Sequence, residues 1–474
     1  MRWTLEQVAQ ELGVSAPAGV DAVARLAGIS IDSRTVRAGE LFIAIHGPRH
    51  DGHTFVAAAL AAGAPAAVVA RERAGQVDER LRGRLLVVED TVAALQQLAR
   101  AVRRKWARDG NGRRLGAITG STGKTTSKEI WAALLAARCR VLKSEGNLNN
   151  EYGLPLTLAR LEEEDAAVVE LGMSHRGELA QLARIAEPEV GVVTNVAPVH
   201  LEFFASVDEI ALAKRELIDG LEGPNPVAVL NADDARVAKF ADGFRGGVVW
   251  FGTGAHAEFR AEKIEDRGAD GSAFDFVGPN GRTRLELPLV GRHNVMNALA
   301  ALAAASAWGV GAAEAQRVFP ALRPALMRGE VLRFEAGFTV INDSYNSNPV
   351  ALASMIDLLA ATRGHRRRIL VAGEMLELGT TSPQLHREAG AYAAKTRQMA
   401  WIIGVQGAAN DLVRGALESG QPESGARFFE NADEAANFVV ELVAPGDLVL
   451  VKGSRGVKME RIVEALERKF EVRA

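Results

Sequence analysis

Apolar and polar positions follow a repeating pattern along most of this chain. Short apolar runs of buried-strand character are each followed by a stretch whose apolar residues are three or four positions apart, the spacing of an amphipathic helix. Beyond residue 114, the strand patterns lie at 115–119, 166–171, 190–195, 227–230, 338–341, 368–372 and 447–451. Strands that alternate with helices are typical of parallel sheets with crossover helices. The pattern therefore predicts an α/β protein.

The first 110 residues show the same alternation on a smaller scale. Strands are predicted at 41–45 and 66–69, and helices at 54–62 and 91–106. The polar, glycine-rich stretch 108–114 is typical of a linker. This part of the chain is expected to form a small α/β unit of its own.

Chain length and the strand patterns together predict three domains. The chain has 474 residues, about the length of three average domains. Residues 259–287 alternate between apolar and polar with glycine-rich turns, as in an antiparallel hairpin insert, and 292–308 form a long alanine-rich helical pattern. A second series of strands and helices begins near residue 321. We expect the domains to span 1–110, 111–320 and 321–474.

The clearest chemical motif is Ile118-Thr119-Gly120-Ser121-Thr122-Gly123-Lys124-Thr125-Thr126. It lies between a buried strand and a helical pattern at 128–135, so its glycine-rich turn aims backbone N–H groups and the helix dipole at an anion. Lys124 adds a cation for terminal phosphates, and the Thr125 hydroxyl is a natural Mg²⁺ ligand. Ile118 stands where the usual pattern has its first glycine. The motif predicts binding of a nucleoside triphosphate.

Polar groups follow the other strands of this region. Glu170 comes at the end of one strand, the stretch from Asn195 to His200 follows the next, and 231–234 follow a third. The carboxyl ends of parallel strands meet at one edge of the sheet, where the phosphate loop also lies. The convergence favours a metal and phosphate site over isolated caps and turns.

Two polar clusters near the N-terminus leave two interpretations open. Residues 31–34 and 46–53 lie at strand ends, where α/β proteins place ligands. The same residue types, Asp, Ser, Gly and Pro, also favour turns. The residues alone do not choose between a ligand site and turn chemistry.

Composition and charge limit the partners and the cellular location that we expect for this protein. The net charge of -3 predicts no bulk attraction to nucleic acid. A single cysteine, Cys139, excludes an internal disulfide framework and suits a reducing compartment. No apolar run is long enough to span a membrane, and the N-terminus lacks the apolar core of a signal peptide. We expect a cytoplasmic protein.

Taken in order, these motifs resemble those of the Mur ligases, ATP-dependent amide ligases that build the peptide of bacterial cell-wall precursors. The resemblance covers nearly the whole chain. It rests on 32–34, the phosphate loop, 146–150, 170–173, His200 through Lys214, 293–294, 343–349 and 452–455. It implies a small N-terminal UDP-binding domain, a central phosphate-loop ATPase-type sheet and a C-terminal Rossmann-like domain.

Within the family, the resemblance is to members that join D-alanyl-D-alanine to the UDP-N-acetylmuramoyl-tripeptide. It implies that ATP phosphorylates the terminal carboxylate of the tripeptide, and that the dipeptide amine then attacks the acyl phosphate. Cations are required where the terminal phosphate meets a carboxylate. The implied catalytic residues are Lys124, Glu170, His200 and Lys214.

The resemblance also implies the ligands of each group. Two Mg²⁺ ions are expected, with Thr125, Glu170, His200 and a CO₂-derived carbamate on Lys214 as ligands. ATP would contact Gly120 to Thr126, with Asn294 and Asn297 at adenine, Asp343 at ribose and Arg328 at phosphate. The implied substrate-binding residues are Ser33, Arg34, His46, Asp51, Asn149, Asn150, Tyr345, Asn346 and Asn348. Met327-Arg328 departs from the Gly-Arg that is common at this place.

Other functions stay open at this stage. A related ligase could add a single amino acid or glutamylate folate, although the loop from Tyr345 to Pro349 favours addition of the dipeptide. The Asp-Asn-Pro-Arg motif of ligases that select meso-diaminopimelate is absent. A protein of a different class, a scaffold that binds ATP without hydrolysing it, is also considered. The presence of Lys124, Thr125, Glu170, His200 and Lys214 argues against it. The third residue of the tripeptide, lysine or meso-diaminopimelate, is left undetermined, and a monomer is expected.

Overall fold

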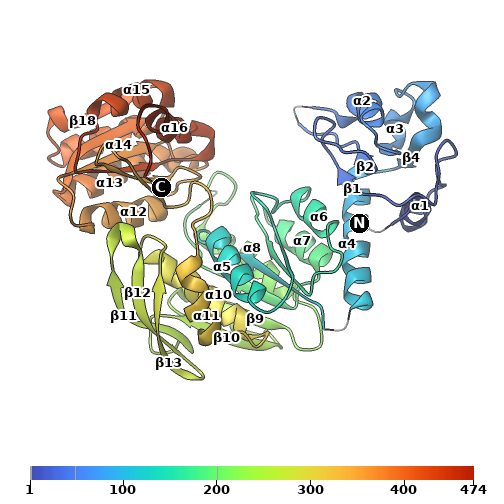
Figure 1. The fold of residues 1–474 in the computed structure, drawn as a ribbon, viewed down its shortest axis with the longest axis horizontal. Coiled ribbons are helices and arrows are strands. Elements are labelled where there is room, and N and C mark those ends of the chain that lie inside the picture. Colours follow the sequence, from blue (N-terminus) through green and yellow to red (C-terminus); the bar gives the residue numbers. More distant parts are fainter. Residues whose placement is uncertain (1–2, 49, 111, 200, 474) are drawn as a thin grey trace. The chain divides into compact units, whose positions relative to one another are not determined.

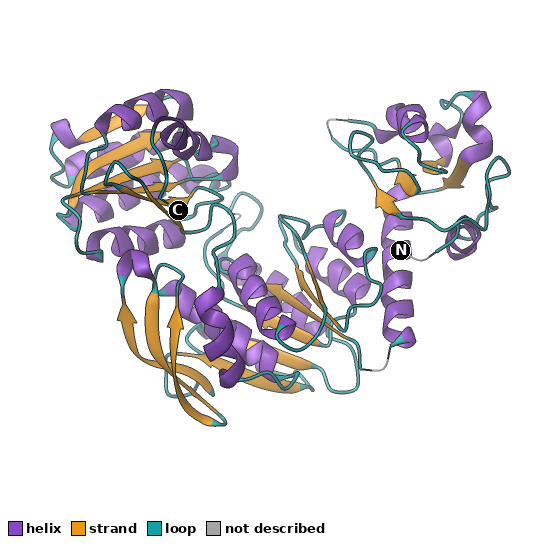
Figure 2. Ribbon diagram, viewed as in Figure 1, coloured by secondary structure: helices purple, strands orange, loops and turns teal. Residues whose placement is uncertain are grey.

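The computed structural model describes residues 3–48, 50–110, 112–199 and 201–473. Figure 1 and Figure 2 show helices alternating with strands along these residues, which confirms the α/β class. The described strands form sheets of four, nine and six strands. Contacts divide the chain into two compact units: the first holds 1–119, 138–191 and 216–227, and the second holds the remainder.

The first unit contains a small four-stranded sheet and the beginning of the large one. Its strands are β1 (Gly28–Ser30), β2 (Glu40–Ile43), β3 (Ala67–Ala70), β4 (Leu85–Val88), β5 (Arg114–Thr119), β6 (Val141–Lys143) and β7 (Ala166–Glu170). Its α-helices are α1 (Leu5–Leu12), α2 (Val56–Ala61), α3 (Arg71–Ala74), α4 (Thr91–Asp109), α6 (Gly153–Leu158) and α7 (Glu178–Ala186). β1 to β4 are parallel and in sequence order, with Phe42 opposite Ala67 and Ala67 opposite Leu85. These residues belong to the buried core of the small sheet.

Two predicted boundaries in this unit were wrong. The helix expected at 54–62 begins as a 3₁₀ turn, Gly52–Phe55, before α2. The linker expected at 108–114 is shorter, because α4 continues to Asp109 and β5 begins at Arg114. α4 is long because the Asp90 carboxylate caps its start, and because one face buries Leu95, Leu98 and other apolar residues.

The second unit holds the phosphate loop, the insert and the C-terminal sheet. Its strands include β9 (Val227–Asn231), β10 (Gly247–Gly252), β11 (Phe259–Asp266), β12 (Ser272–Gly278), β13 (Gly281–Leu287), β14 (Glu330–Arg333), β15 (Thr339–Asp343), β16 (Arg367–Gly373), β17 (Met399–Val405), β18 (Ala426–Phe429) and β19 (Asp447–Lys452). Its α-helices are α5 (Lys124–Ala136), α8 (Val207–Asp219) as far as Arg215, α9 (Ala235–Ala238), α10 (His293–Ser306), α11 (Ala312–Val318), α12 (Pro349–Ala361), α13 (Ser382–Lys395), α14 (Ala409–Glu418), α15 (Ala432–Leu442) and α16 (Glu460–Lys469).

The nine-stranded sheet has the order β13-β12-β11-β10-β9-β8-β5-β7-β6, where β8 is Val190–Val193. β5 and β7 are parallel, with Ile118 opposite Glu170. The antiparallel insert predicted at 259–287 is confirmed, and it has three strands: Ala261 pairs with Phe276, and Phe274 with Leu285. The helix that follows the phosphate loop begins at Lys124, four residues before the predicted start.

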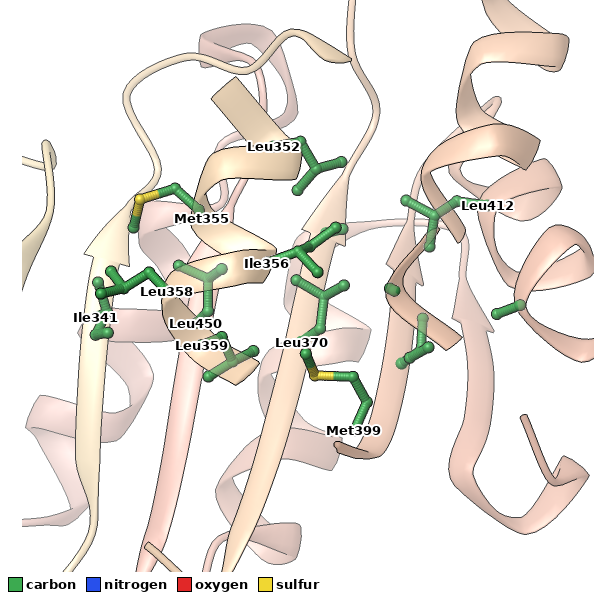
Figure 3. Close-up of a cluster of buried hydrophobic side chains, with 14 of the residues drawn as sticks. Ile341, Leu352, Met355, Ile356, Leu358, Leu359, Leu370, Met399, Leu412 and Leu450 are labelled. Atoms are coloured by element: carbon green, nitrogen blue, oxygen red, sulfur yellow. The ribbon is translucent and has the colours of Figure 1, made fainter. Parts of the chain in front are cut away.

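The six-stranded sheet has the order β14-β15-β19-β16-β17-β18, and only the pair β14–β15 is antiparallel among its described pairings. Figure 3 shows one of its faces, where Ile341, Leu370 and Leu450 of the strands face Leu352 and Ile356 of α12. A second buried cluster, which includes residues of α15 and α16, covers the other face. Helices on both faces of a mainly parallel sheet confirm the Rossmann-like architecture.

Candidate active site

The phosphate loop depends on two glycines whose backbone has positive φ. Gly120 has a φ of 151°, and a Cβ there would lie 1.8 Å from Thr194 Oγ1. Gly123 has a φ of 81°, and a Cβ there would lie 2.1 Å from Asn297 Oδ1. Glycine is therefore required at both positions by conformation and by space.

The residues just after β8 hold the loop in shape. Thr194 Oγ1 donates to the Thr122 carbonyl at 2.6 Å, and Asn195 Oδ1 accepts from the Thr122 N–H at 3.0 Å. Ser121 Oγ donates to the Ala197 carbonyl at 3.2 Å and accepts from the Ala197 N–H at 2.9 Å. The sequence pointed to polar groups after this strand, but not to their role as supports of the loop.

Lys124 and Thr125 occupy the first turn of α5. Lys124 Nζ bends back over the loop and donates to the Gly120 carbonyl at 2.8 Å. Thr125 is 6% exposed, and Thr126 follows it in the same turn. The first N–H groups of a helix have no acceptor within the helix, so this turn combines backbone donors, a cation and a hydroxyl for a phosphate.

Lys214 lies on α8 and is buried, with 2% exposure. Lys214 is therefore not the solvent-exposed lysine that is usual on an amphipathic helix. Burial first, and the charge of Lys124 second, lower the pKa of Lys214 well below its usual value. Both effects favour the neutral amine. The predicted partner His200 lies outside the described residues.

Glu170 ends β7 in the first unit and is 3% exposed. Asn149 Nδ2 donates to Glu170 Oε1 at 2.9 Å, so one predicted substrate residue orients one predicted metal ligand. Asn150 instead accepts the N–H of Gly153 at 2.9 Å and stabilises the start of α6. Carboxylate and hydroxyl oxygens, as in Glu170 and Thr125, are the donors that Mg²⁺ prefers.

The two asparagines of α10 are buried and bonded to each other. Asn297 Nδ2 donates to Asn294 Oδ1 at 2.8 Å, and Asn294 Nδ2 donates to the Val290 carbonyl at 2.8 Å. Ser127 Oγ of α5 lies 3.4 Å from Asn297 Oδ1. The asparagines therefore help to hold α10 against the phosphate-loop helix.

In the C-terminal sheet, Lys452 joins two of the predicted residues. Its Nζ lies 2.6 Å from Asp343 Oδ2 and 2.9 Å from the Asn346 carbonyl oxygen. Asn348 caps α12 by accepting the Ala351 N–H at 2.9 Å. Asp343 and the loop after it are thus held by Lys452, whose motif the sequence had singled out.

The N-terminal clusters contain both turn chemistry and exposed cations. The Asp32 carboxylate binds Arg34 at 2.6 Å, which lowers the pKa of Asp32 to about 2. Asp51 Oδ1 accepts from the His53 N–H at 3.0 Å and lies 2.7 Å from His53 Nδ1. The Arg34 side chain is 85% exposed. Ser33 lies in the same turn, while His46 Nδ1 is 3.7 Å from Asp51 Oδ2.

A cluster of metal-ligating side chains and a membrane-spanning helix are both absent from the described residues. Within the part of the chain that the structure describes, no group of three or more His, Cys, Asp or Glu side chains could hold a metal ion. No helix in that same part is long and apolar enough to cross a membrane.

The site consists of a strand, a glycine-rich loop and a helix that begins at the lysine of the loop. This arrangement defines a phosphate-loop nucleotide-binding protein. Comparison with family models shows which family of phosphate-loop proteins this chain belongs to. The Mur ligase family, catalytic domain matches 25–103; the Mur ligase middle domain matches 118–305; and the Mur ligase, glutamate ligase domain matches 327–455. The chain belongs to the Mur ligase family.

Individual relatives agree with this assignment over nearly the full chain. The UDP-N-acetylmuramoyl-tripeptide–D-alanyl-D-alanine ligase of Bacillus subtilis is 34% identical over 93% of each chain. The Escherichia coli ligase of the same name is 34% identical over 93% of this chain and 94% of its own. A crystal structure of MurF from Acinetobacter baumannii has a TM-score of 0.86, with 30% identity and 99% of each chain covered. MurF from Thermotoga maritima in complex with ADP has a TM-score of 0.79, with 28% identity over 93% of this chain and 97% of that one.

Proposed function

We propose that this ligase joins D-alanyl-D-alanine to the UDP-N-acetylmuramoyl-tripeptide with ATP, in synthesis of the peptidoglycan precursor. Similarity to relatives with this name over 93% of the chain supports the substrate pair. The structural observation that carries the chemistry is the phosphate loop with Lys124 and the buried Lys214 in one unit.

The chain's own residues support phosphoryl transfer to a carboxylate. Backbone N–H groups of the loop and Lys124 would bind the phosphates of ATP and withdraw charge from the transferred group. On the family resemblance, we propose Thr125 and Glu170 as Mg²⁺ ligands, and Asn149 orients the Glu170 carboxylate. Mg²⁺ supplies positive charge that lets phosphate and carboxylate approach. The dipeptide amine then attacks the acyl phosphate, and inorganic phosphate leaves.

The buried amine of Lys214 fits a carbamate. Carbamylation requires the neutral amine, and burial together with Lys124 lowers the pKa of Lys214 in that direction. A carbamate would replace a repelling cation by oxygen ligands for a second Mg²⁺. We propose His200 as a further ligand of that ion, on the family resemblance alone.

The remaining contacts extend over the three domains, which we place at 1–110, 111–320 and 321–474. Ser33, Arg34, His46 and Asp51 are proposed for uridine diphosphate. Asn294 and Asn297 are proposed for adenine, and Asp343 for ribose. Asn150, Tyr345, Asn346 and Asn348 are proposed for the tripeptide and dipeptide. We also propose a monomer that works in the cytoplasm, where ATP and nucleotide-linked precursors are available.

The test is a ligation assay with purified protein, MgATP, the tripeptide precursor and D-alanyl-D-alanine. We expect phosphate release that needs both substrates, and a product heavier than the tripeptide precursor by one dipeptide less water. D-alanine and L-glutamate serve as competing acceptors; preference for either would identify a ligase that adds a single amino acid. Precursors ending in lysine and in meso-diaminopimelate, compared side by side, would identify the third residue.

A further inference from the structure

Arg328 lies between two residues with left-handed backbone. Met327 has a φ of 59° and Gly329 a φ of 74°. This conformation is uncommon for a side chain such as methionine, so the surroundings must hold it. The Met327 carbonyl accepts the Tyr345 N–H at 3.1 Å, and Arg455 Nη1 lies 3.3 Å from Met327 Sδ. Met327 is also 8% exposed, so its side chain is anchored in the fold.

The geometry places the Arg328 guanidinium over the ring of Tyr345. Its Cζ lies 4.1 Å from the ring centroid. Among the described residues, Arg328 makes no ion pair with a carboxylate. A guanidinium that stacks by its face keeps the N–H groups of its edges for another acceptor. Arg328 is thus oriented without being neutralised.

Arg455 provides an internal contrast. It is farther from the same ring, at 5.9 Å, and its Nη1 lies 3.1 Å from Glu460 Oε1. Its charge is therefore already compensated. Of the two arginines beside Tyr345, Arg328 is the one arranged to meet an added anion.

We propose that Tyr345 is a positioning residue: it holds Arg328 by cation–π stacking, so that Arg328 presents its N–H edge to a phosphate of the bound nucleotide. The inference rests on the proposed function for the presence of bound ATP, and on the family resemblance for the placement of Arg328 at its phosphates. It gives Tyr345 a role toward the nucleotide in addition to the contact with the peptide substrates proposed above.

A double-mutant cycle tests the proposal. The variants are Tyr345→Leu, Arg328→Ala and the two combined, with Tyr345→Phe as the conservative control. For each, the Kd of a non-hydrolysable ATP analogue with Mg²⁺ is measured by calorimetry, together with KM for ATP and for D-alanyl-D-alanine. Thermal unfolding of every variant checks that the fold is retained.

We expect Tyr345→Leu to weaken binding of the nucleotide on the order of fivefold, because the stacking energy is lost. Tyr345→Phe keeps the ring and should stay within about twofold of the unmodified protein. In the Arg328→Ala background, Tyr345→Leu should have no further effect on the Kd of the ATP analogue.

Additive effects of the two substitutions on the Kd would overturn the proposal, as would a raised KM for the dipeptide with an unchanged nucleotide Kd. Failure of the proposed function has a different signature. It would appear as absence of dipeptide ligation by the unmodified protein, while the nucleotide-binding cycle would still report whether Tyr345 acts through Arg328.

Discussion

Positive charges are placed in opposite settings in two regions of this protein. On the β11–β13 insert, Arg282 and Arg284 are 49% and 41% exposed, and each lies within 2.8 Å of a glutamate, Glu262 or Glu265. Near the phosphate loop, Lys214 is 2% exposed, and the charge of another lysine, Lys124, adds to the effect of burial in lowering its pKa. Exposed, paired charges contribute little to stability, whereas burial beside a like charge changes the chemistry of a lysine.

The comparison separates structural charge from functional charge. Arginines of the insert can each find a carboxylate on the opposite strand, because cross-strand neighbours are close. Near the loop, burial and the charge of Lys124 act together on Lys214, and conversion of its amine to a carbamate would remove the repulsion between the two side chains. A buried amine whose pKa is lowered in this way therefore indicates a functional site.

The largest expected effect comes from Lys124→Ala. We expect kcat/KM for ATP to fall at least about 100-fold, because a cation at the transferred phosphate is lost. The unfolding midpoint should change little. Lys263→Ala, on the exposed insert, is the matched control and should keep full activity. Near-native turnover of Lys124→Ala would contradict the role of the loop.

The second effect is that of Lys214→Ala, which we expect to be nearly inactive. A short carboxylate such as formate, added at millimolar concentration, should partly restore turnover by supplying oxygen ligands in place of the carbamate. Formate should not rescue Lys124→Ala. Full activity of Lys214→Ala, or a bare ammonium there in a metal-bound crystal structure, would refute the carbamate.

The third effect concerns stability and pH. The pKa of Lys214 is lower in the folded protein than in the unfolded chain, so between these two values the unfolded chain binds more protons. The stability of the unmodified protein should then rise with pH toward about 10.5, relative to Lys214→Met. In CO₂-depleted buffer, denaturant titrations at pH 7 and pH 10 should show Lys214→Met more stabilised at pH 7. An equal difference at both pH values would mean that Lys214 titrates normally.

The smallest effect is expected on the insert. Arg284→Ala should cost at most about 1 kcal/mol of unfolding free energy, and less at high salt, because its pairs with Glu265 and Asp275 are exposed. Ligase activity should be unchanged. A loss of activity without a loss of stability would show that the insert contributes to function, and the contrast with the phosphate loop would fail.

The phosphate loop could be predicted from the sequence because strand, glycine turn and helix are contiguous. The α/β class was also predictable, since alternating patterns report it locally. The burial of Lys214 was not, because it depends on what packs around α8 and not on the spacing within it. Likewise, the antiparallel direction of β14 and the supports of the loop at Thr194 and Asn195 arise from contacts between distant segments.

Thr194 lies close to Gly120, and Asn297 lies close to Gly123. These contacts limit how well the phosphate loop could keep its shape in another protein. Its nine-residue motif carries the chemistry of phosphate binding but only part of the information for its own shape. The rest resides in Thr194 and Asn297, whose hydrogen bonds to Thr122 and Ser127 span 72 and 170 positions of the chain. A graft of the motif into another scaffold would need both partners to come with it.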